Sequence, residues 1–200
     1  MASGWKRAYV AISLILVLFA AWLGMVSVSL FLLYGFPIIF GLSGAFILAR
    51  QGGAGTQPLA PAVTALRLYF AAHLIWSSVR YWFFTDLQPV IPFPVAQMFL
   101  GALDAMGVFP GIKAMEGVIG LMLLANRYVP LALVLEVPTS VTIFYLNTFI
   151  TGTPHTLVSG PAELLVNVLL LLGYYGYYRP FLVARAEPAP PSFREERVQA

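Results

Sequence analysis

The chain contains no cysteine and few charged residues, and each absence removes a class of proteins. Without cysteine there is no disulfide, no thiolate zinc site, no iron–sulfur cluster and no internal thiol relay. Any redox chemistry would therefore need a cofactor that is not held through a thiol. Charged residues make up only 10% of the 200 residues, whereas hydrophobic residues make up 60%, and the mean hydropathy is +0.86. This composition is typical of a membrane protein.

Catalytic and metal-binding motifs are also missing. The sequence has no phosphate-binding loop, no Ser-His-Asp order and no His-Glu-x-x-His motif, so no catalytic residue is assigned. Its two histidines, His73 and His155, do not indicate a metal site. The net charge of +3 comes from basic residues scattered at the ends of apolar segments, which does not favour nucleic acid as a partner.

Long apolar segments dominate what is present. Residues 8–49 contain no charged side chain, and four further apolar stretches follow. A helix needs about 20 apolar residues to cross a hydrocarbon core of about 30 Å. Helices also satisfy their own backbone hydrogen bonds in lipid. We therefore expect an all-α fold, a polytopic integral membrane helix bundle surrounded by membrane lipids.

The apolar segments predict about six transmembrane helices, at residues 8–28, 29–49, 65–84, 111–126, 129–150 and 162–181. The first stretch is twice the length of one span, so we expect a tight hairpin there. The alternative is one long tilted helix followed by a re-entrant piece broken at residues 34–37. This stretch is also longer than the apolar part of a secretory signal, about 7 to 15 residues, so we expect it to remain as an anchor.

These spans divide the chain into four parts. We expect a transmembrane hairpin at 1–50, a cytoplasmic loop at 51–64, a four-helix membrane core at 65–182 and a flexible cytoplasmic tail at 183–200. An outer loop at 85–110 interrupts the core. Within that loop, residues 97–107 are apolar enough to form a short helix in the membrane interface.

The basic residues predict the orientation, because the cytoplasmic ends of spans carry the excess of Lys and Arg. With six spans and both termini in the cytoplasm, nine of the 11 basic residues lie on the cytoplasmic side, and only Arg80 and Lys113 lie outside. A five-span version moves Lys6 and Arg7 outside and weakens the ratio to seven against four. We therefore expect cytoplasmic N- and C-termini.

Polar and small residues recur at helical spacing on the last three spans, which predicts a polar interior. The three stripes consist of Lys113, Glu116, Gly120 and Arg127, of Glu136, Thr139, Ser140 and Asn147, and of Glu163, Asn167, Tyr174 and Tyr178. Together with the third span they give the candidate ligand-binding residues, which are Arg80, Lys113, Glu116, Asn147, Glu163 and His73.

Charged groups in this interior need partners, because a charge at the bilayer centre costs about 2.5 to 3.5 kcal/mol on insertion scales. From their depth, we expect Arg80 to pair with Glu116 or Glu163, and Arg67 to form a buried ion pair with Glu136. Three interpretations are open. The pairs hold helices together, or an outward-facing polar cavity binds a small molecule or quinone head group, or carboxylates at two depths form a proton path.

His73 lies mid-span on the same helix face as Ser77 and Arg80. Such a histidine is either a hydrogen-bonding packing residue or a contact for a haem or a quinone. A haem held by two histidines of one chain is disfavoured, because His155 lies in a loop.

A family pattern runs through residues 66–181. It consists of Arg67 opening an apolar helix that ends near Arg80 and Tyr81, then Gly111, then Glu116 in the run Glu-Gly-Val-Ile-Gly-Leu-Met-Leu-Leu, then Arg127. This order resembles the DoxX-like family of small four-helix bacterial membrane proteins, and the N-terminal hairpin lies outside the resemblance. The resemblance implies a four-helix core associated with membrane redox chemistry, including thiosulfate to quinone electron transfer or partnership with oxidative-stress enzymes.

The expected function is a small integral subunit or accessory of a redox complex in a prokaryotic inner membrane, with a quinone or lipid as the bound molecule and without catalytic activity of its own. The alternative is a purely structural scaffold subunit. A small-solute transporter is less favoured, because no inverted repeat is visible. Small residues of the hairpin favour it as the interface with other integral membrane subunits, and they are Gly24, Gly35, Gly41, Ser43 and Gly44.

Overall fold

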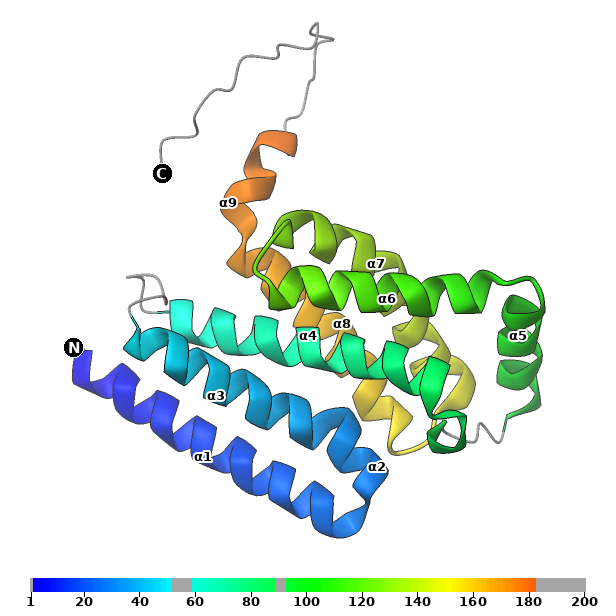
Figure 1. Cartoon of the computed structure of the whole chain (residues 1–200), viewed down its shortest axis with the longest axis horizontal. Helices are drawn as coiled ribbons and strands as arrows, with labels where there is room; N and C mark the ends of the chain where they lie inside the picture. Colours follow the sequence, from blue (N-terminus) through cyan, green and yellow to red (C-terminus); the bar gives the residue numbers. More distant parts are fainter. Residues whose placement is uncertain (1, 52–58, 89–92, 183–200) are drawn as a thin grey trace, which may run out of the picture.

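The computed structural model describes residues 2–51, 59–88 and 93–182, and within these ranges the regular structure is entirely helical (Figure 1). The all-α prediction is confirmed. The predicted tail at 183–200 lies outside the described residues, as do residues 52–58 and 89–92 of the two predicted loops.

The helices follow the predicted order. The elements are α1 (Ala2–Val26), α2 (Val28–Leu30), the π-helical η1 (Phe31–Gly35), α3 (Phe36–Arg50), α4 (Ala60–Phe83), α5 (Pro94–Ala105), α6 (Val108–Leu124), α7 (Val129–Tyr145), the π-helical η3 (Leu146–Thr151), α8 (Thr156–Gly173) and α9 (Tyr175–Tyr178). Five helical runs of the described chain are long and apolar enough to cross a membrane, and α5 with α6 passes the same test as a pair bent by 82°. Five to six such segments indicate a membrane-embedded, multi-pass protein.

The N-terminal segment forms the predicted hairpin. In Figure 1, α1 and α3 run antiparallel, and α2 lies at the turn between them. The chain reverses at Ser27, whose backbone is extended (φ −163°, ψ 128°) and whose side chain accepts a hydrogen bond from the Leu30 N–H. The alternative of one long helix broken at residues 34–37 is wrong. Those residues lie instead at the junction of η1 and α3, within a single helical run from Val28 to Arg50.

Helix α4 is the centre of the molecule. It packs against α3 on one side and α6 on the other, and α6, α7 and α8 complete a four-helix core that returns to α4 (Figure 1). The buried apolar side chains of this core come from all four helices and are Phe70, Ala71, Leu74, Ile119, Leu123, Val129, Ala132, Leu133 and Leu170. Helix α1 lies outside α3 and exposes most of its side chains.

Two glycines allow the close approach of α3 and α6 to α4. A Cβ atom at Gly41 would lie 2.5 Å from the Ala65 carbonyl oxygen, and one at Gly120 would lie 3.0 Å from the Ala71 carbonyl oxygen. Neither position has room for a side chain unless backbone moves. The small residues therefore bring helix backbones together, as they do in many membrane bundles.

This packing shows how two of the small residues of the hairpin are used. Gly41 and Gly44 face α4, where a Cβ at Gly44 would lie 2.6 Å from the Leu68 side chain. These two small residues are used within the chain, and the hairpin as the interface with other subunits stays a prediction. Gly24 and Ser43 are exposed.

Three boundaries also differ from the prediction. Helix α4 begins at Ala60, so the loop assigned to 51–64 is shorter. The outer-loop helix is α5, Pro94–Ala105, rather than 97–107. It is tied to α4 by the Tyr81 hydroxyl, which donates to the Asp104 carboxylate at 2.8 Å. The last span is α8, Thr156–Gly173, rather than 162–181. It starts early because Thr153 and Thr156 exchange side chain to backbone hydrogen bonds of 3.2 and 2.9 Å, in the manner of a capping box.

Candidate functional site

Most of the polar side chains predicted to face inward are buried or half-buried in the four-helix core, but Arg127, at the end of the α6 stripe, is exposed. Arg67, His73 and Arg80 of α4, Glu116 of α6 and Glu136 of α7 each have at most 9% of their surface exposed. Ser140 of α7 and Asn167 of α8 are fully buried and joined by a 3.1 Å hydrogen bond from the Asn167 amide to the Ser140 hydroxyl. The predicted polar interior is thus present.

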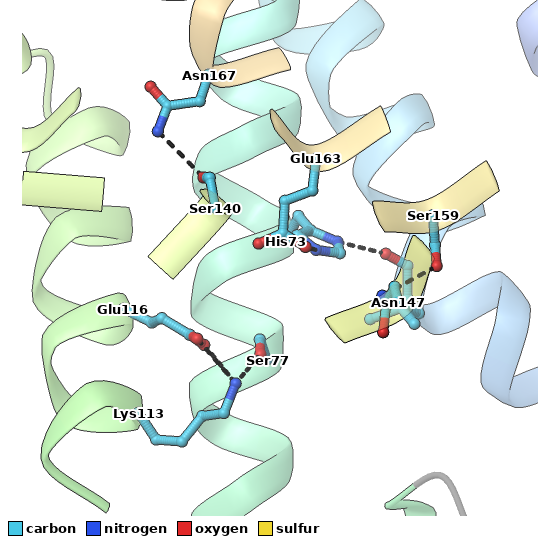
Figure 2. A network of polar contacts seen from close by, with 10 residues as sticks. His73, Ser77, Lys113, Glu116, Ser140, Asn147, Ser159, Glu163 and Asn167 are labelled. Carbon is cyan, nitrogen blue, oxygen red and sulfur yellow. Dashed lines mark hydrogen bonds and ion pairs between the residues drawn. The ribbon is translucent and has the colours of Figure 1, made fainter. Parts of the chain in front are cut away.

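One cluster in this interior connects α6 with α4. The Lys113 Nζ atom lies 2.8 Å from both carboxylate oxygens of Glu116 and 3.0 Å from the Ser77 hydroxyl oxygen. Figure 2 shows Lys113 reaching from α6 toward both acceptors. The Glu116 side chain is only 2% exposed. Because the ammonium group donates to every acceptor in reach and the carboxylate is paired, this cluster resembles a closed structural contact.

The predicted pairing of Arg80 is wrong. Glu116 pairs with Lys113, and the basic group nearest to Glu163 is His73. Lys113 lies three residues before Glu116 on the same helix face, so it reaches that carboxylate more easily than a residue of another helix can. Arg80 is buried near Glu116 and Tyr34, and its Nε atom has no hydrogen-bond partner in the described part of the chain.

The predicted pair of Arg67 and Glu136 is also wrong. The Arg67 guanidinium donates to the backbone carbonyl of Leu123, in the last turn of α6. This carbonyl also accepts from the Asn126 N–H at 3.2 Å, and it belongs to the negative end of the helix dipole, which an arginine side chain stabilises. Arg67 is therefore a capping residue that joins α4 to α6.

Glu136 is left without a cation. It is fully buried, and neither carboxyl oxygen has a hydrogen-bond partner among the described residues. Glu116, Glu163 and Lys113 are the charged residues that act on it electrostatically. An isolated charge there would cost several kcal/mol, so we expect Glu136 to be protonated and neutral.

A second cluster surrounds His73, on the side of α4 toward η1 and α8. The imidazole ring stacks against Tyr34 of η1 and Tyr69 of α4, with ring centroids 5.8 and 6.0 Å away and planes within 20°. The Tyr34 ring also contacts His155, at 5.8 Å. His73 is thus held in an aromatic environment inside the bundle.

The hydrogen bonds of His73 define the roles of its two ring nitrogens. Nδ1 lies 2.9 Å from the Leu33 carbonyl oxygen. A carbonyl oxygen only accepts hydrogen bonds, so Nδ1 carries the proton. Nε2 faces the Glu163 carboxyl group, 3.8 Å away, which is too long for a direct hydrogen bond. The two side chains are 11% and 13% exposed, close to the 12% of Lys113 and more than the 2% of Glu116.

Both π-helical segments of the described chain border this second cluster. Segment η1 supplies the Leu33 carbonyl and Tyr34, and η3 supplies Asn147. The Asn147 amide lies 3.4 Å from the Ser159 hydroxyl, one turn before Glu163 on α8 (Figure 2). Short π-helical turns are rare and are often found at functional sites.

Of the six candidate ligand-binding residues, the structure joins Lys113 with Glu116 and His73 with Glu163. It places Asn147 beside the second pair through Ser159. Sequence reasoning missed Tyr69, although it lies one turn before His73 on the same face.

Sequence reasoning also missed Tyr34 and the Leu33 carbonyl. The only signal for these two was the Tyr-Gly-Phe-Pro sequence at residues 34–37, which suggested a break in the helix.

Within the described residues, no group of three His, Asp or Glu side chains is placed to hold a metal ion. Comparison with protein-family models, with curated proteins and with solved structures gave no match. The functional argument therefore rests on the chemistry of the two clusters.

Proposed function

We propose that this protein is a small integral subunit or accessory of a prokaryotic membrane redox complex and that it binds a quinone head group at His73 and Glu163. The supporting observation is the geometry of this pair. One nitrogen of His73 is occupied by a backbone carbonyl, while the other lies 3.8 Å from a carboxyl group without a direct hydrogen bond to it.

The chemistry of this pair suits both forms of a quinone. A quinone carbonyl oxygen needs a donor, which a protonated His73 Nε2 or a protonated Glu163 provides. A hydroquinone hydroxyl needs an acceptor, which neutral Nε2 or the Glu163 carboxylate provides. The flat ring of the ligand can also stack on a tyrosine ring such as Tyr34 or Tyr69, which already stack on His73.

The wider context is part of the same proposal. The arrangement Arg67, Glu116 and Arg127 resembles the DoxX-like family, and the basic residues favour an inner membrane with both termini in the cytoplasm. The apolar side chains of α1 face outward and include Val10, Leu14, Leu18 and Met25. Membrane lipids or the helices of partner subunits would cover this surface.

Gentle detergent extraction from native membranes, followed by mass spectrometry of proteins and small molecules, tests the proposal. We expect a quinone to co-purify together with cofactor-bearing subunits. His73→Leu should lower the quinone content about tenfold, the effect of losing one well-placed hydrogen bond. The control is the double variant Lys113→Met with Glu116→Leu, which changes the other cluster and should retain the quinone. Absence of quinone from the wild-type protein, or equal content in His73→Leu, would contradict the proposal.

A scaffold subunit is the second candidate, because the Lys113 cluster and the close contact at Gly120 fix the helices without a ligand. The same extraction separates the two. A scaffold would recover partner subunits in stoichiometric amount, with no quinone that depends on His73.

A further inference from the structure

Pro37 lies where it affects the acceptor of His73. It is fully buried and sits inside the continuous helical run from Val28 to Arg50. In an α-helix, the N–H of residue 37 would bond to the carbonyl of residue 33, four positions earlier. Proline has no N–H, and its ring crowds that carbonyl. The Leu33 carbonyl therefore loses its regular helical partner because of the residue at position 37.

The local backbone departs from α-helical spacing at this point, so a non-proline residue 37 would bond to the Leu33 carbonyl only once the helix returned to that spacing. Just before Pro37 the helix widens into η1, where the N–H of Phe36 bonds to the carbonyl of Phe31, five residues back. Carbonyls freed by a proline in a membrane helix are commonly satisfied by side chains of neighbouring helices. Here His73 of α4 supplies that donor, with Nδ1 at 2.9 Å from the Leu33 oxygen.

We propose that Pro37 is a positioning residue. It keeps the Leu33 carbonyl available to His73, and this hydrogen bond fixes the proton on Nδ1 and directs Nε2 toward Glu163. The part of this inference that concerns a ligand rests on the proposed quinone site. The part that concerns the tautomer of His73 does not.

The tautomer can be measured directly. Protein labelled with ¹⁵N-histidine and reconstituted in lipid is examined by NMR at alkaline pH, where a neutral imidazole reports which nitrogen carries the proton. His155→Gln assigns the two histidine signals. We expect His73 in the wild-type chain to be protonated on Nδ1. Protonation on Nε2 in the wild-type chain would overturn the proposal without any variant of Pro37.

Pro37→Ala restores an N–H that competes for the Leu33 carbonyl. We expect the Nδ1–H signal of His73 to weaken and the Nε2–H signal to appear. The matched control is Pro138→Ala, which removes a proline from the interior of α7, and it should leave the His73 spectrum unchanged. A Pro37→Ala spectrum identical to that of the wild type, in a protein with unchanged helical circular dichroism, would overturn the proposal.

Quinone titration of the same samples separates this inference from the proposed function. If Pro37 positions His73 for the ligand, Pro37→Ala should weaken the affinity for a short-chain benzoquinone about tenfold. His73→Gln, whose amide nitrogen is placed near Nε2, should retain more affinity than His73→Asn. If the tautomer changes and no sample binds quinone, the proposed function fails while the role of Pro37 for His73 stands. If wild type and Pro37→Ala bind equally, the positioning role toward the ligand fails.

Discussion

Two buried glutamates in the same interior have opposite surroundings. Glu116 of α6 is 2% exposed and accepts two hydrogen bonds of 2.8 Å from Lys113. Glu136 of α7 has no exposed surface and no hydrogen-bond partner within the described chain. The first carboxyl group is paired with a cation, and the second, which has none, is expected to be neutral. Burial of a charged residue type in a membrane bundle therefore does not by itself indicate a charge, an ion pair or a binding role.

The difference comes from the neighbouring positions on each helix. Lys113 lies three residues before Glu116, whereas the positions three and four residues from Glu136 are Ala132, Leu133, Thr139 and Ser140. None of these is a cation. Arg67, the cation expected for Glu136, instead caps the carboxyl end of α6.

The largest loss of stability is expected from Glu116→Leu, which leaves the Lys113 ammonium buried without a carboxylate. Breaking a buried pair in this way costs about 3–5 kcal/mol. The free energy of unfolding, measured by denaturant titration in detergent micelles or bicelles, should fall by this amount. The double variant Lys113→Met with Glu116→Leu is the control and should recover most of the loss. A single variant as stable as the double variant would show that the pair is not charged.

An intermediate loss of stability is expected from Lys113→Met, which leaves Glu116 without a cation, as Glu136 is. Glu116 can then take up a proton, so the loss is limited to the hydrogen bonds of Lys113, about 1–3 kcal/mol in the same unfolding assay. A loss as large as that of Glu116→Leu would mean that Glu116 cannot become neutral in this interior.

The smallest loss of stability is expected from Glu136→Gln. The amide has nearly the shape of a protonated carboxyl group, so the free energy of unfolding should change by less than about 1 kcal/mol. The matched substitution Glu116→Gln should cost several times more, because it leaves Lys113 without an anion. Equal losses for the two glutamine variants would remove the distinction between the glutamates.

Much of the fold follows from the sequence, because the need for about 20 apolar residues per span constrains it strongly. The hairpin and the inward polar faces of Glu116, Ser140 and Glu163 were predictable from length and helical periodicity, whereas the central position of the third span was not predicted. The start of α8 was not, because it depends on hydrogen bonds between Thr153 and Thr156 that apolar periodicity does not reveal.

The pairing of the site residues was predicted less well. The ion pairs were predicted by matching charged residues of different helices at the same depth. This approach overlooked partners on the same helix, such as Lys113 for Glu116. It also ignored backbone acceptors, which bind the Arg67 guanidinium in place of the Glu136 carboxylate and occupy Nδ1 of His73. In our account the Leu33 carbonyl is available as an acceptor because Pro37 follows it by four residues. The spacing of polar and apolar side chains does not reveal a free backbone carbonyl.

The central claim is that the two clusters on α4 have separate roles, the Lys113 cluster holding helices and the His73 cluster binding a quinone. Titration of a short-chain benzoquinone into protein in lipid nanodiscs tests it most directly. We expect His73→Leu to weaken binding about tenfold. The double variant Lys113→Met with Glu116→Leu should bind with the wild-type affinity. Unchanged binding by His73→Leu, or loss of binding in the double variant alone, would contradict the claim.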